Sequence, residues 1–216
     1  MSPPLVSEGP SWVVSPANRG GSSPKELQGG ARGSAQRMKS IKVVIVGPFN
    51  AGKTTLVKTL SEISMTHDVE VTSPQERAKK RTTTVGMDFG IVNIGEGYVV
   101  RLFGSPGQPR FSFMWRVFMP GTDGVIFMVD SSDREALPEA AREFARARST
   151  FSGLPMVVAA NKQDVPDAMP PEVVRFVLDV PSTVPVIPCV ATDRGMAWRV
   201  LGTLLEEVFR VNRIQV

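Results

Sequence analysis

The chain has 216 residues, of which 42% are hydrophobic, so it can form one domain with a substantial core. Its formal net charge is +4, but most of this charge lies in residues 1–40, and we therefore expect no nucleic-acid-binding face. One cysteine and one histidine exclude an intrachain disulfide and a Cys/His metal cluster. No apolar run reaches the roughly 18 residues of a membrane span, so we expect a cytoplasmic protein without an integral membrane segment.

Composition divides the chain into two parts. Residues 1–38 are rich in Pro, Gly and Ser and hold few large apolar groups, so we predict a disordered leader. Residues 39–216 are predicted to form the folded domain. Met38 directly precedes the first predicted strand and is an alternative start of the protein.

The segment Gly47–Thr54 reads G-x-x-x-x-G-K-T and lies between an apolar strand, predicted at 41–46, and a helix, predicted from Lys53 to about Ile63. Glycines in this context let backbone N–H groups turn toward a polyphosphate, and the helix N-terminus faces the same anion. Lys53 would reach the β- and γ-phosphates, and the Thr54 hydroxyl would bind Mg²⁺. We expect phosphate contacts from Asn50, Ala51, Gly52, Lys53, Thr54 and Thr55.

The remaining pattern alternates between strands and helices. Strands are predicted at 87–94, 98–103, 124–129, 155–160 and 186–190, the first two as a hairpin. Residues 111–119 are predicted to form a short helix or an irregular segment, and further helices are predicted after a cap at Ser131–Asp133, at 171–178 and from Gly195 onward. Residues 64–85 show no sustained period and are predicted to form a loop. This order predicts an α/β fold with a six-stranded, mostly parallel sheet, one antiparallel edge strand and about five helices.

A second motif, Asn161-Lys162-Gln163-Asp164, follows a buried strand at the sheet edge where α/β proteins bind ligands. The Asp164 carboxylate can accept hydrogen bonds from both N1–H and the exocyclic amine of guanine, a donor pair that adenine lacks. Asn161 and Lys162 belong to the same predicted guanine site. Ala191 and Thr192 follow the last strand, and a backbone N–H there would meet the guanine O6. Cys189 is predicted to be a packed residue rather than a nucleophile.

Together these motifs resemble the Ras superfamily of small GTPases over residues 41–211, which implies a three-layer P-loop GTPase fold. The segments Leu102–Gln108 and Val129–Glu135 are most similar to Arf-like proteins, the β-subunit of the signal-recognition-particle receptor, and their prokaryotic relatives. That prokaryotic group includes a GTPase that controls gliding-motility polarity. Since neither end carries a lipid-anchor signal, we favour the prokaryotic branch.

The resemblance also assigns the residues that respond to the γ-phosphate. It implies that Thr84 closes over Mg²⁺ and the γ-phosphate, with Thr83 or Thr82 as alternatives. It implies that the Gly107 N–H senses the γ-phosphate and that Gln108 orients the attacking water.

Two positions depart from the family pattern. Gly104 stands where relatives usually carry an Asp that holds Mg²⁺ through water, so the metal would rest on Thr54, Thr84, phosphates and waters. Phe49 stands where many relatives carry a small glycine, and its bulk would obstruct Gln108 or an incoming arginine. The first departure predicts weaker retention of Mg²⁺ without implying inactivity, and the second predicts slow intrinsic hydrolysis that needs a partner protein.

The sequence therefore predicts a molecular switch that binds GTP or GDP with Mg²⁺ and hydrolyses GTP slowly. The alternatives are a nucleotide-bound scaffold with little or no turnover and, less well supported, a phosphate-loop kinase, which leaves Asn161–Asp164 unexplained. The expected partners are regulatory and effector proteins that contact the switch regions, by resemblance of the roadblock or longin type. The apolar set at Phe111, Phe113, Met114, Trp115 and Phe118 is predicted to divide between core and an exposed docking face.

Overall fold

The computed structural model of the chain describes residues 38–65, 68–70, 82–84, 87–95, 97–108, 111 and 113–212, with the side chains of 68–70 and 82–84 left aside. The predicted leader, apart from Met38, lies outside the described residues. The described residues form a seven-stranded sheet with the strand order β2-β5-β6-β1-β7-β8-β9 and a separate two-stranded sheet of β3 and β4. None of the helices among them is long and apolar enough to cross a bilayer.

The centre of the large sheet is parallel. It consists of β6 (Tyr98–Gly104), β1 (Lys39–Val46), β7 (Gly124–Asp130), β8 (Met156–Asn161) and β9 (Val186–Pro188). Every residue of β7 and β8 is buried, because helices cover both faces of the sheet. The carboxyl ends of these strands lie at one edge, where Asp130 pairs in register with Asn161.

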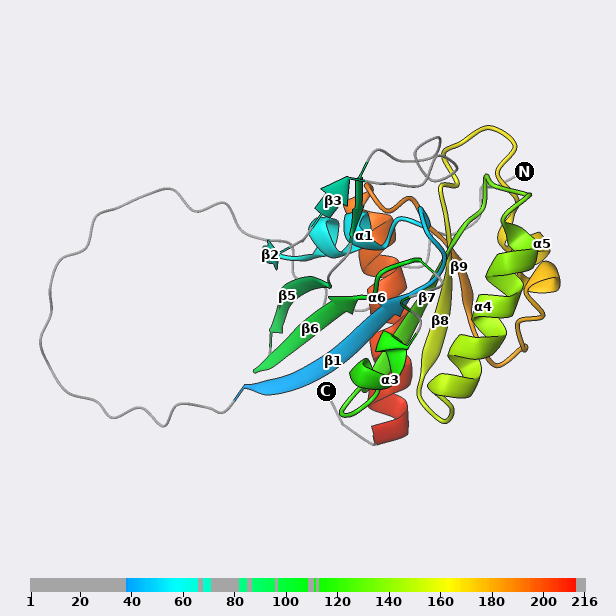
Figure 1. Cartoon of the computed structure of the whole chain (residues 1–216). Coiled ribbons are helices and arrows are strands. Elements are labelled where there is room, and N and C mark those ends of the chain that lie inside the picture. Colours follow the sequence, from blue (N-terminus) through cyan, green and yellow to red (C-terminus); the bar gives the residue numbers. More distant parts are fainter. Residues whose placement is uncertain are drawn as a thin grey trace, which may run out of the picture.

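Helices form a layer on each face of the sheet (Figure 1). On one face, α1 (Lys53–Leu60) and α6 (Arg194–Asn212) pack with residues such as Val43, Ile45 and Met128. On the other face, α3 (Met114–Phe118), α4 (Leu137–Thr150) and α5 (Pro171–Val177) enclose a second cluster that includes Val44 and Phe127. The predicted α/β fold with five helices is confirmed for the described residues.

The antiparallel side of the sheet is larger than predicted. The hairpin of β5 (Asp88–Gly95) and β6 is confirmed, but β2 (Ile63–Met65) adds a seventh strand to the predicted six by pairing with β5. The segment 64–85 was predicted to be a loop, yet β3 (Asp68–Glu70) and β4 (Thr82–Thr84) pair within it. Strands of three residues carry too few positions to show a period in the sequence.

Two helix boundaries also differ from the prediction. Helix α1 ends at Leu60 rather than near Ile63, and Ile63 is exposed on β2, so its helical spacing was accidental. Helix α4 begins at Leu137, four residues after the predicted cap. Asp133 instead stabilises the preceding turn, where its Oδ1 accepts a hydrogen bond from the Ala136 N–H at 3.1 Å.

Candidate nucleotide-binding site

The phosphate loop between β1 and α1 requires glycine at two positions. Gly47 and Gly52 have φ angles of +136° and +100°, which L-residues rarely adopt. A Cβ at Gly47 would lie 2.1 Å from the Met128 carbonyl oxygen, and one at Gly52 would lie 2.2 Å from Asn161 Nδ2. The loop therefore packs against the ends of β7 and β8 without room for a side chain at either position.

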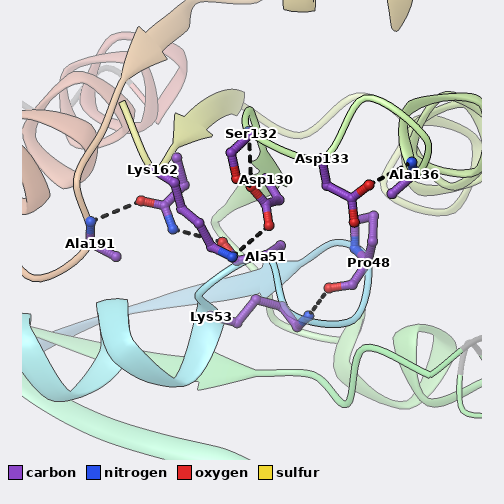
Figure 2. Close-up of polar contacts among 10 residues, drawn as sticks. Pro48, Ala51, Lys53, Asp130, Ser132, Asp133, Ala136, Lys162 and Ala191 are labelled. Atoms are coloured by element: carbon purple, nitrogen blue, oxygen red, sulfur yellow. Dashed lines mark hydrogen bonds and ion pairs between the residues drawn. The ribbon is translucent and has the colours of Figure 1, made fainter. Parts of the chain in front are cut away.

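The Lys53 side chain folds back over this loop. Its Nζ donates hydrogen bonds to the carbonyl oxygens of Gly47 at 2.7 Å and Pro48 at 2.6 Å, and only 6% of the residue is exposed. Figure 2 shows the bond to Pro48. The ammonium group is thus held at the loop, where the sequence places bound phosphate oxygens. When a polyphosphate binds, its charged oxygens would replace these neutral carbonyl oxygens as acceptors, and the hydrogen bonds from Lys53 would become stronger.

Asn161, at the end of β8, joins the phosphate loop to the loop after β9. Its Nδ2 donates to the Ala51 carbonyl at 2.8 Å, and its Oδ1 accepts from the Ala191 N–H at 2.8 Å. Ala51 is therefore a buried part of the scaffold rather than a lining residue. The Ala191 N–H, predicted to meet the guanine O6, is directed at Asn161.

Lys162 is held beside Asn161 by an ion pair. Its backbone is left-handed (φ 65°), and its Nζ donates to Asp130 Oδ2 at 2.5 Å. Asp130 Oδ1 in turn accepts from the N–H and Oγ of Ser132 at 3.0 and 2.6 Å, as Figure 2 shows. The lysine stem is thereby fixed across the ends of β7 and β8. Sequence reasoning placed Asp130 at a strand end but did not assign it this role.

The predicted phosphate and guanine residues converge on one cleft. Eleven of them line it: Asn50, Gly52, Lys53, Thr54, Thr55, Gly107, Asn161, Lys162, Asp164, Ala191 and Thr192. Phe49, Ser105, Val165 and Val190 line it as well but were not predicted to bind the nucleotide. The Asp164 carboxylate belongs to an exposed residue in this lining, so a base could reach it from solvent. One cleft thus holds both the phosphate loop and the residues predicted to recognise a base.

The residues predicted to respond to the γ-phosphate lie in different places in the described structure. Gly107 lies against the phosphate loop, since a Cβ there would be 2.5 Å from Lys53 Nζ and 2.8 Å from Phe49 backbone atoms. Gln108 is 5% exposed and does not line the cleft. Thr84 lies in β4, opposite Asp68 of β3, and its side chain is outside what the structure describes.

Asp88 is a site residue that sequence reasoning missed. It is the first residue of β5, only 1% of it is exposed, and its Oδ2 accepts a hydrogen bond from the Thr54 hydroxyl at 2.7 Å. The available signal was an acidic residue at the start of a strand whose alternate positions, Gly90 and Val92, are buried on the same face.

Glu143 of α4 is a second buried acid and lies within the electrostatic reach of Lys53. Burial raises the pKa of its carboxyl group to about 7, and the positive charge of Lys53 opposes this shift. Cys189, by contrast, is fully buried, and burial raises its thiol pKa to about 12, so it is an inert packed residue as predicted.

Comparisons with known proteins place this site in a family. The ADP-ribosylation factor family matches residues 31–203. The chain is 29% identical to ADP-ribosylation factor-like protein 3 of Chlamydomonas reinhardtii, over 70% of this chain and 78% of that protein. It is 27% identical to ADP-ribosylation factor-like protein 2 of Arabidopsis thaliana, over 77% of this chain and 79% of the relative.

A third relative and a solved structure agree with this assignment. ADP-ribosylation factor-related protein 1 of Rattus norvegicus is 34% identical over 57% of this chain and 59% of its own length. The fold matches the Arl6 BBS3 small GTPase of Trypanosoma brucei, which was solved with the nucleotide analogue GppNp. The TM-score is 0.63 at 22% identity, covering 80% of this chain and 99% of that one. The chain therefore belongs to the ADP-ribosylation factor family of small GTPases, enzymes that hydrolyse GTP to GDP and phosphate.

Proposed function

We propose that this protein is a guanine-nucleotide switch that binds GTP and GDP with Mg²⁺, hydrolyses GTP slowly and is regulated by partner proteins. The observation that carries the proposal is the single cleft that joins Lys53 and Thr54 to Asn161 and Asp164. Asn161 bonds directly to the phosphate loop, so phosphate and base would be bound by one rigid unit. A phosphate-loop kinase would not require Asn161 and Asp164 in the same cleft.

The residues beside Thr54 fit a Mg²⁺ ion. Mg²⁺ prefers oxygen ligands and usually takes one or two from the protein, with phosphates and waters as the rest. The Thr54 hydroxyl and the adjacent Asp88 carboxylate supply such oxygens. The described residues contain no cluster of three acidic, His or Cys side chains, which suits a site completed by nucleotide phosphates. When bound, the ion would neutralise charge on those phosphates.

Slow hydrolysis is supported by the position of Gln108. Its side chain is buried away from the cleft, so a role in orienting water requires movement of the segment around Gly107. Phe49 also lines the cleft, and its backbone lies beside Gly107, since a Cβ at Gly107 would be 2.8 Å from Phe49 backbone atoms. Partners that move this segment would therefore accelerate turnover, and without them the alternative of a nucleotide-bound scaffold applies.

The test has two steps. The purified protein is denatured and the released nucleotide is identified by ion-exchange chromatography, with guanine nucleotide near one per chain as the expected result. Adenine nucleotide would overturn the base assignment.

In the second step, single-turnover hydrolysis of bound GTP by wild type is compared with hydrolysis by Gln108→Leu, which we expect to be at least tenfold slower. The matched control is Gln163→Leu, whose native amide donates to the Met169 carbonyl at 2.9 Å. Equal rates for wild type and Gln108→Leu would favour the scaffold.

The expected docking face for partners is the exposed side of α3 and the residues around it. Phe113, Val117 and Met119 are 62%, 68% and 45% exposed, whereas Trp115 and Phe118 are buried. This division agrees with the predicted split of the apolar set between core and surface. We propose that regulatory and effector proteins bind there, with roadblock- or longin-type partners suggested by resemblance alone.

Several finer assignments also remain proposals. They are a cytoplasmic location, a boundary between leader and GTPase domain near residue 39, and membership of the prokaryotic branch that includes the gliding-motility regulator. The relationship to the β-subunit of the signal-recognition-particle receptor has the same standing. These assignments rest on residue patterns, and the relatives reported above come from an alga, a plant and a mammal.

A further inference from the structure

Asp88 and Gly104 lie opposite each other at the ends of two antiparallel strands, beside the phosphate loop. Asp88 begins β5, Gly104 ends β6, and the two are direct partners in the β5–β6 register. A Cβ at Gly104 would lie 2.9 Å from Asp88 Cβ and 3.0 Å from Asp88 Oδ2. The Asp88 side chain therefore fills the space in which a side chain of residue 104 would lie.

The Asp88 carboxylate contacts the hydroxyl that is proposed to bind Mg²⁺. Thr54 Oγ1 donates its proton to Asp88 Oδ2 at 2.7 Å. A hydroxyl has one donor hydrogen and two lone pairs, so this donor bond does not use the lone pairs through which the Thr54 oxygen would bind a cation. Partners that orient a metal-binding group and supply negative charge behind it typically affect metal affinity 10- to 100-fold.

Burial makes this contact costly unless a positive charge is near. Asp88 is 1% exposed, and the Thr54 hydroxyl, a neutral donor, only partly offsets the desolvation of an ionised carboxylate. A divalent cation beside Thr54 would offset it much further.

We propose that Asp88 is the positioning residue of the Mg²⁺ site: it orients the Thr54 hydroxyl and supplies from β5 the negative charge that Gly104 of β6 cannot. The inference rests on the proposed function, because it presumes that Mg²⁺ binds with the nucleotide at Thr54. It accounts for a Mg²⁺ site in a chain that has glycine at position 104.

The test measures release of a fluorescent GDP analogue into excess unlabelled GDP, over a series of free Mg²⁺ concentrations and in EDTA. For wild type, Mg²⁺ slows release, and the midpoint concentration reports the affinity for the metal. Asp88→Asn, which keeps the shape of the side chain, is expected to raise that midpoint 10- to 100-fold. Its release rate in EDTA should stay within about twofold of wild type, since without metal the carboxylate has no ion to hold.

Asp123→Asn is the matched control. Asp123 Oδ2 accepts a hydrogen bond from the Lys42 N–H at 2.7 Å. Asp123 directly precedes β7, whose other end faces the cleft. The same chemical change there should leave the Mg²⁺ midpoint unchanged. Unchanged midpoints for both variants would overturn the proposal, as would an Asp88→Asn variant that speeds release equally in EDTA and in Mg²⁺, because that pattern indicates a purely structural role.

If Asp88→Asn does not fold, a double variant that moves the carboxylate from β5 to β6 still tests the proposal. In the double variant Asp88→Gly/Gly104→Asp, the Cβ and carboxylate of residue 88 are both removed from the space next to residue 104, and the carboxylate moves to β6. We expect its Mg²⁺ midpoint to return to within about fivefold of wild type, while Asp88→Gly alone keeps the raised midpoint. A folded double variant without this recovery would overturn the proposal.

Failure of the proposed function gives a different result from failure of the role of Asp88. If wild type retains no guanine nucleotide at any Mg²⁺ concentration, the switch assignment itself is overturned. If wild type retains GDP but its release does not depend on Mg²⁺, guanine binding stands and the role of Asp88 toward the metal is overturned.

Discussion

The side-chain amide of Asn161 donates a hydrogen bond to the backbone carbonyl of Ala51 at 2.8 Å, across 110 residues of sequence. The same side chain accepts from the Ala191 N–H. Since Asn161 is only 3% exposed, both backbone groups would lose their partner in a buried setting if this side chain were removed. Asn161 is thus the structural link between the phosphate loop and the loop after β9, which lie on two sides of the cleft.

Asn161→Ala should therefore lower both stability and nucleotide affinity. We expect the free energy of unfolding to fall by about 2–4 kcal/mol, because two buried backbone groups lose their hydrogen bonds. Urea unfolding and nucleotide titration would measure the two effects. Gln163→Ala, the control, removes one part-buried bond to Met169 and should cost about 1 kcal/mol without weakening nucleotide binding. Equal costs for both variants would contradict the linking role.

Gly107→Ala should weaken binding of GTP more than binding of GDP. The new methyl group would lie 2.8 Å from Phe49 backbone atoms, which cannot move without shifting the phosphate loop. The Gly107 N–H would be displaced from the γ-phosphate end of the cleft, and we expect about a tenfold loss of GTP affinity. Calorimetric titration with GDP and a non-hydrolysable GTP analogue would show it. Gly195→Ala on α6, where the nearest atom is Asp193 Oδ1 at 3.3 Å, should leave both affinities unchanged.

Because of Glu143, the free energy of unfolding should decrease as the pH rises from 5 to 7. The folded state raises the pKa of this carboxyl from 4.5 to about 7, mainly through burial, so between these values the folded state binds more protons than the unfolded state. Stability from this group is therefore lost with increasing pH, by roughly 2–3 kcal/mol in all, and changes little above pH 7.

Urea unfolding at several pH values would test this prediction. Glu143→Gln should flatten the dependence between pH 5 and 7, whereas Glu206→Gln, at an exposed position of α6, should preserve it. A slope that survives in Glu143→Gln would assign the pH dependence to another group.

The two faces of α3 should respond differently to truncation. Trp115 is 3% exposed and its Nε1 donates to Ser105 Oγ at 3.2 Å, so Trp115→Ala should cost about 3–5 kcal/mol. Phe113 is 62% exposed, so Phe113→Ala should change stability by no more than about 0.5 kcal/mol. Thermal unfolding of both variants checks this, and a large cost at Phe113 would mean that its ring is packed rather than available to a partner.

The sequence by itself determined those parts of the protein whose chemistry is local. The motif at Gly47–Thr54 and the segment Asn161–Asp164 are each a run of consecutive residues, and residues of both line the cleft. The long apolar runs of β1, β7 and β8 predicted a doubly covered parallel sheet, because only strands buried on both faces are apolar throughout.

Only the tertiary structure decided which distant residues complete the site. Asp88 reaches Thr54 because β5 returns antiparallel beside β6, and no local pattern gives that register. The three-residue strands β2, β3 and β4 are likewise stabilised by pairing rather than by their own sequence. The sequence alone therefore suggested a gap at Gly104, whereas the packing of two strands places the Asp88 carboxylate in that space.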